Sequence, residues 1–333
     1  MSSLEASPHS LRSGNKGGAP GVSRRRVTEI LWCYAFILPF LFFFVGLTIW
    51  PILGTIVYSF NKLDAFGQIQ KFVGLANFRT VLADTTFYKS IVNAVFFTVA
   101  NTAIKLPLSL FLAILLTRKW LKGTILARTG FFLPLVIPGA IIGMIFTFLL
   151  NPANGSVNAL LMQLHLVTRP IDFTGSRWMG MSTMVVISVW GVLGTYMIYW
   201  MAAIQSIPEE MYEAAEIDGA NEWQQLIYIT LPMIRPIATI ILFLGLVGAV
   251  QVFDLVLTLT GGGPGNETYT IAYYIYQRGF TASPPNIGVA SAASVIFGFA
   301  TLIIVSLQGY FVSRSQNEQQ EKTTKAAYVS SRG

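Results

Sequence analysis

The acidic side chains of this 333-residue chain gather in one short stretch, between Ser206 and Pro232. Six of the fifteen carboxylates are found there: Glu209, Glu210, Glu213, Glu216, Asp218 and Glu222. Carboxylates form strong, directed hydrogen bonds with the cationic groups of Arg and Lys. The stretch also lies between two long apolar runs. We therefore interpret it as a docking element for a separate protein.

The other residues that could carry chemistry do not predict catalysis. The histidines, His9 and His165, are distant in sequence, and no metal-ligand spacing or nucleophile–base arrangement stands out. No G-x-x-x-x-G-K-[ST] pattern occurs, because no lysine follows the glycine cluster at 261–265. The single cysteine, Cys33, excludes a disulfide within the chain. We expect no cofactor, no metal and no covalent chemistry in this polypeptide.

Two short helices are predicted to position the carboxylates. Ser206 and Glu209 have the spacing of a capping box, and Pro208 falls in the first turn, where its missing N–H costs little. Gly219 supplies the left-handed residue that ends such a helix. The sequence therefore predicts a first amphipathic helix that ends at a glycine hinge.

The second short helix is predicted to begin at Asn221, which repeats the capping pattern with Gln224, and to stop at Pro232. An ordinary loop that folds on the membrane surface is the alternative interpretation. A helix lying on a membrane is expected to carry Lys or Arg on its polar face. This stretch carries carboxylates instead, so docking is favoured.

The composition is typical of a membrane protein. Hydrophobic residues make up 53% of the chain and charged residues only 11%, whereas soluble domains carry about 25% charged residues. The net charge of +7 does not indicate a nucleic-acid partner, because the basic residues flank apolar runs instead of forming one stripe.

Apolar runs long enough to cross a bilayer recur along the chain. The sequence therefore predicts an all-α, polytopic membrane protein with six transmembrane helices, at about 30–60, 88–117, 126–150, 180–203, 236–260 and 287–312. The domain boundaries are a disordered cytoplasmic tail at 1–29, a six-helix domain at 30–312 with the acidic loop at 204–235, and a cytoplasmic C-terminal tail at 313–333. A cleaved signal peptide is disfavoured, because the first run is too long and lacks a convincing cleavage site.

Lys and Arg in the short connections predict the orientation. The tail to residue 29 has five, the segment 117–129 has four with no acid, and the tail from residue 313 has four. An even number of spans places these segments on one side. The opposite connections hold seven, spread over longer stretches with four acids. Both termini are predicted to be cytoplasmic.

The acidic stretch resembles the EAA loop of permease subunits in bacterial ABC importers. That pattern is EAA, three residues, Gly, nine residues and I-x-L-P, and it is matched by Glu213, Ala214, Ala215, Gly219, Ile229, Leu231 and Pro232. The resemblance implies that the loop couples the chain to a separate ATPase. The implied coupling residues are Glu209, Glu210, Met211, Glu213, Ala214, Ala215, Asp218, Gly219, Ala220, Trp223, Leu226, Leu231 and Pro232.

Three outer segments, at 72–78, 260–264 and 270–280, are similar to the carbohydrate-uptake branch of that family, so that the resemblance covers about 30–313. It implies a type I importer permease in the bacterial plasma membrane that takes up a sugar or sugar-like solute by alternating access. The implied partners are a second, distinct permease, two ATPase subunits that bind ATP and Mg, and an extracytoplasmic solute-binding protein.

Charge within a span predicts function. Lys105 lies near the middle of the second run, and Asp254 lies towards the outer end of the fifth, with Gln251 three residues before it on the same predicted face. Lys105 either serves the solute path, pairs with Asp254, or turns its ammonium towards the interface or a helix carbonyl. Intramembrane Lys105 and Asp254 would also suit an ion-coupled secondary transporter or channel, the alternative function. The acidic loop, and the lack of a visible inverted repeat, disfavour that alternative.

Sugars are bound by aromatic faces together with polar groups. Trp190 and Tyr196 on the fourth run, and Ser291 and Ser294 on the sixth, are the remaining candidates for the solute path. Packing between helices and hydrogen bonds that bridge them are the alternative roles for these four side chains.

Overall fold

The chain forms two units, residues 1–54 and 55–333, and the computed structural model describes residues 24–117 and 122–330. In the first unit, helix α1 (Arg24–Phe44) leads through a π-helical turn, η1 (Val45–Ile49), into the start of α2 (Trp50–Ser59). Residues 24–29, which the sequence places in a disordered tail, are the first residues of α1. Arg and Glu there are good helix formers. Residues 1–23 lie outside the described part.

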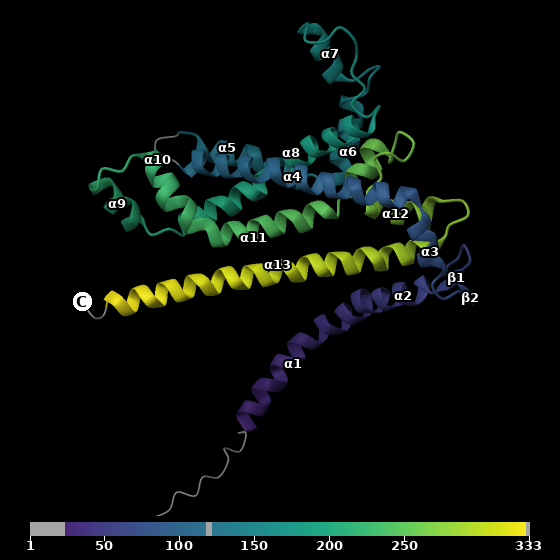
Figure 1. The fold of residues 1–333 in the computed structure, drawn as a ribbon, viewed down its shortest axis with the longest axis horizontal. Coiled ribbons are helices and arrows are strands. Elements are labelled where there is room, and N and C mark those ends of the chain that lie inside the picture. Colours follow the sequence, from purple (N-terminus) through teal and green to yellow (C-terminus); the bar gives the residue numbers. More distant parts are fainter. Residues whose placement is uncertain (1–23, 118–121, 331–333) are drawn as a thin grey trace, which may run out of the picture. The chain divides into compact units, whose positions relative to one another are not determined.

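The second unit takes in the end of α2 and then a β-hairpin, and its remaining elements are helical (Figure 1). Strand β1 (Asn61–Leu63) pairs antiparallel with β2 (Ile69–Phe72), with Asn61 opposite Phe72. The turn forms because Asp64 Oδ1 accepts the N–H groups of Phe66 and Gln68.

The helical elements follow in chain order. They are α3 (Ala76–Ala83), α4 (Thr85–Thr117), α5 (Thr124–Phe132), the 3₁₀ turn η2 (Leu133–Val136), α6 (Gly139–Leu149), α7 (Ser156–Gln163), α8 (Arg177–Gln205), α9 (Glu209–Ile217), α10 (Glu222–Gln225), the π turn η3 (Leu226–Thr230), α11 (Leu231–Val250), the π turn η4 (Val256–Thr260), α12 (Ile271–Tyr276), the π turn η5 (Gln277–Thr281) and α13 (Ile287–Ser330).

Five helices in the described part of the chain are long and apolar enough to cross a membrane, and a bent pair adds a sixth if it counts as one span. The five are Trp32–Ser59, Thr85–Thr117, Arg177–Gln205, Glu222–Val250 and Ile287–Tyr310. All-α architecture with five or six spans confirms the predicted fold class. The last helix continues to Ser330, so the segment from 313 is helical over most of its length.

The third predicted span is broken. Helices α5 and η2 meet α6 at an angle of 96°. Two prolines explain the break, because Pro138 has no backbone N–H and disfavours helical geometry at the residue before it. Ile137 is accordingly extended, with ψ 124°. Pro134 lies within η2 itself.

The fifth span begins and ends earlier than the predicted 236–260. Helices α10, η3 and α11 run on from one another, and α11 ends at Val250. Pro232 directly follows the π turn η3 and lies in the first turn of α11, so it does not stop the helix as predicted. Residues 251 and 254 therefore lie beyond the span.

Helices α4, α8 and α11 pack against one another (Figure 1). A polar seam follows one face of α4, and we define it as Asn93, Asn101, Lys105 and Ser109. Asn101 Nδ2 donates to Ser188 Oγ at 3.0 Å, and Ser109 Oγ accepts from Trp200 Nε1 at 3.1 Å. Water does not drive helices together inside a bilayer, so such hydrogen bonds and close packing hold them.

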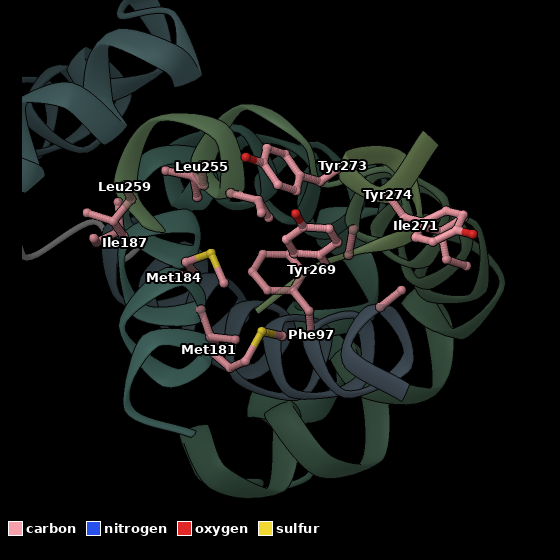
Figure 2. Packing of buried hydrophobic residues seen from close by; sticks show 14 of the residues in the cluster. Phe97, Met181, Met184, Ile187, Leu255, Leu259, Tyr269, Ile271, Tyr273 and Tyr274 are labelled. Carbon is pink, nitrogen blue, oxygen red and sulfur yellow. The ribbon is translucent and has the colours of Figure 1, made fainter. Parts of the chain in front are cut away.

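The end of the seam at Asn93 joins a buried aromatic and sulfur-rich core. Asn93 Nδ2 donates to the carbonyls of Glu267 and Tyr269, both at 2.8 Å. Figure 2 shows Phe97 of α4 and Met181 and Met184 of α8 gathered around Tyr269. The seam thereby ties the loop before α12 to the main helices.

Helix α8 also approaches the backbone of α5 closely at Gly194. A Cβ there would lie 2.3 Å from Phe131 O, a separation that no side chain tolerates. Three residues earlier, a Cβ at Gly191 would meet only Ile142 Cδ1, at 3.5 Å. A side chain is therefore excluded at Gly194 and tolerated at Gly191.

We expect Gly194→Ala to lower the free energy of unfolding by about 1–3 kcal/mol, because α5 must move away from α8. The melting temperature of the purified protein in detergent measures this effect. Gly191→Ala is the matched control on the same helix and should melt close to the wild type. Equal melting temperatures for the two variants would disprove the close approach.

A second cluster fastens α12 and η5 to the start of α4. Tyr274 Oη donates to Asp84 Oδ2 at 2.8 Å, Arg278 pairs with the same oxygen, and Thr86 N donates to Asp84 Oδ1. Burial raises the pKa of Asp84, but the hydrogen bonds from Tyr274 and Thr86 and the charge of Arg278 outweigh it. The pKa of Asp84 therefore lies below its ordinary value.

A carboxylate with a lowered pKa stabilises the fold above its unfolded pKa of 3.8, and this contribution is lost as pH falls through the folded value. We expect Arg278→Met to melt lower than the wild type at pH 7, with the difference narrowing below about pH 4. Melting temperatures between pH 7 and pH 3 test this. Arg278→Lys keeps the charge and should lose less. A difference that stays constant across the range would contradict the assignment.

Candidate functional site

The acidic element, residues 206–232, forms α9, a glycine turn and α10 leading into α11. The predicted capping box of Ser206 with Glu209 is wrong. Ser206 is the C-terminal cap of α8, with φ −77° and ψ −8°, and its hydroxyl donates to Ala203 O at 2.7 Å. Pro208 precedes α9 instead, with no side-chain cap. Glu209 and Glu210 still occupy the first turn, where they offset the positive end of the helix dipole.

The predicted left-handed conformation of Gly219 at the end of α9 is confirmed, with φ +81°. Ala220 N donates to Ala215 O at 2.8 Å and Gly219 N to Glu216 O at 3.0 Å, which is the Schellman pattern. A Cβ at Gly219 would meet no atom within 4 Å, so the constraint there is the backbone conformation and not space.

The capping box at Asn221 and Gln224 is also confirmed. Gln224 N donates to Asn221 Oδ1 at 2.9 Å, and Asn221 N donates to Gln224 Oε1 at 2.8 Å. A further hydrogen bond, 2.9 Å long, joins Tyr212 Oη of α9 to Thr230 Oγ1 of η3. Both short helices are therefore held by specific contacts.

A groove of about 570 Å³ lies between α9, α10 and the end of α4. Carboxylates line it from two helices, namely Glu209, Glu213, Glu216 and Glu222. Sequence reasoning did not include Glu216 and Glu222 among the coupling residues, although both belong to the same acidic run. Tyr212 and Leu226 contribute to the walls.

Apolar side chains are exposed beside these carboxylates. Ile217 is 87% exposed and Trp223 is 72% exposed, while Met211 and Leu231 are also exposed. No residue of α9 is buried. A hydrophobic and acidic surface of this kind is typical of a protein interface. Ile217 was not predicted, but its place in the last turn of an amphipathic helix is a usable signal.

Of the candidates for the solute path, the structure brings Lys105 and Tyr196 together. The Lys105 ammonium lies 4.2 Å from the centroid of the Tyr196 ring, and it donates to Gly245 O of α11 at 3.4 Å. The expectation that Lys105 pairs with a helix carbonyl agrees with this contact. Thr102, one turn earlier and also buried, was not among the predicted residues.

The predicted pairing of Lys105 with Asp254 is wrong. Helix α11 ends at Val250, so that Gln251 is its C-terminal cap and Asp254 lies beyond a break in the helix. Gln251 and Asp254 therefore do not share a helical face. Asp254 is exposed and lies beside Gly139, where a Cβ would be 3.2 Å from Asp254 Oδ2. An ion-coupling pair inside the membrane therefore has no support.

The remaining candidates for the solute path, Trp190, Ser291 and Ser294, are not brought together by any of their contacts. Trp190 packs edge-on against Phe146 of α6, with ring centroids 5.7 Å apart. Ser294 Oγ donates to Ala290 O in its own helix at 2.9 Å, and Ser291 is buried. Within the described ranges, no group of three or more His, Cys, Asp or Glu could hold a metal ion.

Comparison with known proteins gives consistent matches over most of the chain. Residues 105–317 match the family model described as "Binding-protein-dependent transport system inner membrane component". A probable starch degradation products transport system permease protein of Thermoanaerobacterium thermosulfurigenes is 34% identical, over 86% of this chain and 96% of its own. An sn-glycerol-3-phosphate transport system permease protein of Agrobacterium fabrum is 31% identical, over 84% of this chain and 92% of its own.

A crystal structure of a bacterial ABC transporter involved in the import of the acidic polysaccharide alginate contains a chain with the same fold. The TM-score is 0.77 at 25% identity, with 87% of this chain and 98% of that chain covered. The chain belongs to the family of inner membrane components of binding-protein-dependent transport systems, and it is a non-catalytic permease subunit.

Proposed function

We propose that this chain is the permease subunit of an ATP-driven importer for a sugar or sugar-like solute. The family membership supports import through a membrane, and the named relatives support the solute class. Those names include starch degradation products and an anionic polyol phosphate, and the transporter in the similar structure is involved in the import of an acidic polysaccharide. The class of solute therefore spans neutral and anionic carbohydrates.

One observation carries the coupling part of the proposal: α9 is an exposed, acidic helix that is fastened to two membrane spans. At one end, Ile207 is buried in a cluster with Met197 and Trp200 of α8. At the other end, α10 runs through η3 into α11 without a break. A force on α9 would therefore be passed to α8 and α11 instead of being lost in a flexible loop.

The proposed partner at this element is a separate ATPase subunit that holds ATP and Mg. Two such subunits, a second permease and an extracytoplasmic solute-binding protein complete the proposed complex, in which both termini of this chain face the cytoplasm. The exposed Met211, Ile217 and Trp223 supply apolar contact area, and the carboxylates of the groove supply partners for Arg or Lys.

The proposed mechanism is alternating access. Closure of the ATPase pair moves the acidic element as a rigid body, and α8 and α11 move with it. Helix α4 packs against both of these helices, so their movement changes the contacts of the polar seam. The solute site would then open to one side of the membrane at a time.

Gly219 tests the rigid hinge. We expect Gly219→Val to reduce ATP-dependent uptake while ATP hydrolysis continues, because a β-branched residue pays roughly 1–2 kcal/mol or more for the left-handed conformation. Uptake and hydrolysis in liposomes containing the whole transporter measure the coupling ratio. Gly219→Asn is the matched control, since Asn tolerates this conformation and the site has room for a side chain. Normal coupling in the Val variant would count against the hinge.

Glu213, which lines the groove, tests the interface. We expect Glu213→Lys to abolish copurification of the ATPase with this chain and to stop uptake, because like charges would face each other. Glu213→Gln removes the charge at equal size and should have a smaller effect. Wild-type copurification and uptake in the Lys variant would refute the proposed contact.

A further inference from the structure

Lys105 is a buried charge whose role the proposed mechanism leaves open. Lys105 is only 2% exposed and lies where α4, α8 and α11 pack against one another. The described residues include no ion-pair partner for it. Its contacts are the Tyr196 ring and a 3.4 Å hydrogen bond to Gly245 O. That distance is at the weak end of the range for hydrogen bonds.

The Lys105 ammonium has more N–H donors than it has acceptors. An ammonium has three N–H donors, and only one has an oxygen partner here. Thr102 lies one turn away on the same helix, and its buried Oγ1 has no hydrogen-bond partner among the described residues. An unpaired charge inside a membrane bundle is costly. The missing group should therefore be a hydrogen-bond acceptor, and a negative charge would satisfy it best.

Both side chains face the same point on α11. A Cβ at Gly245 would lie 3.6 Å from Thr102 Cγ2 and 3.7 Å from Lys105 Cε. The backbone of α11 at Gly245 thus lies close to both side chains in this conformation. When α11 moves with the acidic element, the weak bond to Gly245 O is the contact that must break.

We infer that the Lys105 ammonium, together with the Thr102 hydroxyl, receives an oxyanion of the solute when α11 moves away from α4. The solute would then be a sugar that carries a carboxylate or a phosphate. This inference rests on the proposed function and narrows its substrate class. A purely structural lysine would hold the helices together but would not discriminate between charged and neutral solutes.

The test uses the whole transporter in liposomes, with its ATPase and solute-binding protein, and three radiolabelled probes. The probes are sn-glycerol 3-phosphate, a galacturonic acid disaccharide and maltotriose, which separate phosphate, carboxylate and neutral solutes. We expect ATP-dependent uptake of one anionic probe in preference to maltotriose. Lys105→Met should raise KM for that probe about 10- to 100-fold, the effect of losing one charge-assisted hydrogen bond, and should reduce the preference.

Two further variants separate solute recognition from packing. Lys105→Arg keeps the charge and should keep the preference for the anionic probe. Ser109→Ala removes the seam hydrogen bond to Trp200 one turn further along α4, and it should leave the preference unchanged even if stability falls. If Lys105→Met does not assemble, the wild-type preference and Lys105→Arg decide the question.

The results have distinct meanings. An unchanged anion preference in Lys105→Met, or a wild type that prefers maltotriose, overturns this inference and leaves the proposed function standing. A loss of preference in Ser109→Ala as large as that in Lys105→Met also overturns it, because packing would then explain both. Absence of ATP-dependent uptake for all three probes overturns the proposed function and the inference with it.

Discussion

The packing of α4 against α8 and α11 depends on polar contacts made where no water can replace them. Inside a bilayer the lipid tails are as apolar as the helix surfaces, so the hydrophobic effect does not select one helix partner over another. The polar seam does select, because Asn101, Lys105 and Ser109 each need a partner on a neighbouring helix. Small residues allow close approach elsewhere in the bundle, as at Gly194, where a Cβ would lie 2.3 Å from Phe131 O of α5. The seam thereby fixes the register of three spans.

Hydrogen bonds also explain how the acidic element can be stiff although little of it is buried. Its helices are too short to be stable alone, and no residue of α9 is buried. Its order comes from the ends: the Schellman turn at Gly219, the capping box at Asn221 and the bond from Tyr212 to Thr230. Each of these contacts gives a backbone or hydroxyl group a hydrogen-bond partner within the protein in place of water. Local hydrogen bonding thus replaces the missing core while the acidic face stays exposed on the surface.

Much of this could be predicted from sequence, because apolar length and turn chemistry are local properties. The membrane fold, the left-handed Gly219 and the cap at Asn221 follow from neighbouring residues. The errors arose where tertiary context decides. Pro232 did not end a helix because a π turn before it leaves the proline in a first turn, and Ser206 closes α8 instead of starting α9. The pairing of Lys105 with Asp254 failed because the end of α11 could not be located from hydropathy.

The seam and the acidic element meet on one segment of α8. Tyr196, which lies against the Lys105 ammonium, belongs to the same buried cluster as Trp200, Met201 and Ile207. That cluster also includes Ile234 and Ile241 of α11. A rigid displacement of α9 therefore acts on both α8 and α11, the helices that enclose Lys105, because both contribute residues to this buried cluster. Because close-packed cores respond as units and do not deform continuously, movement at the acidic surface and exposure of the buried charge are expected to occur together.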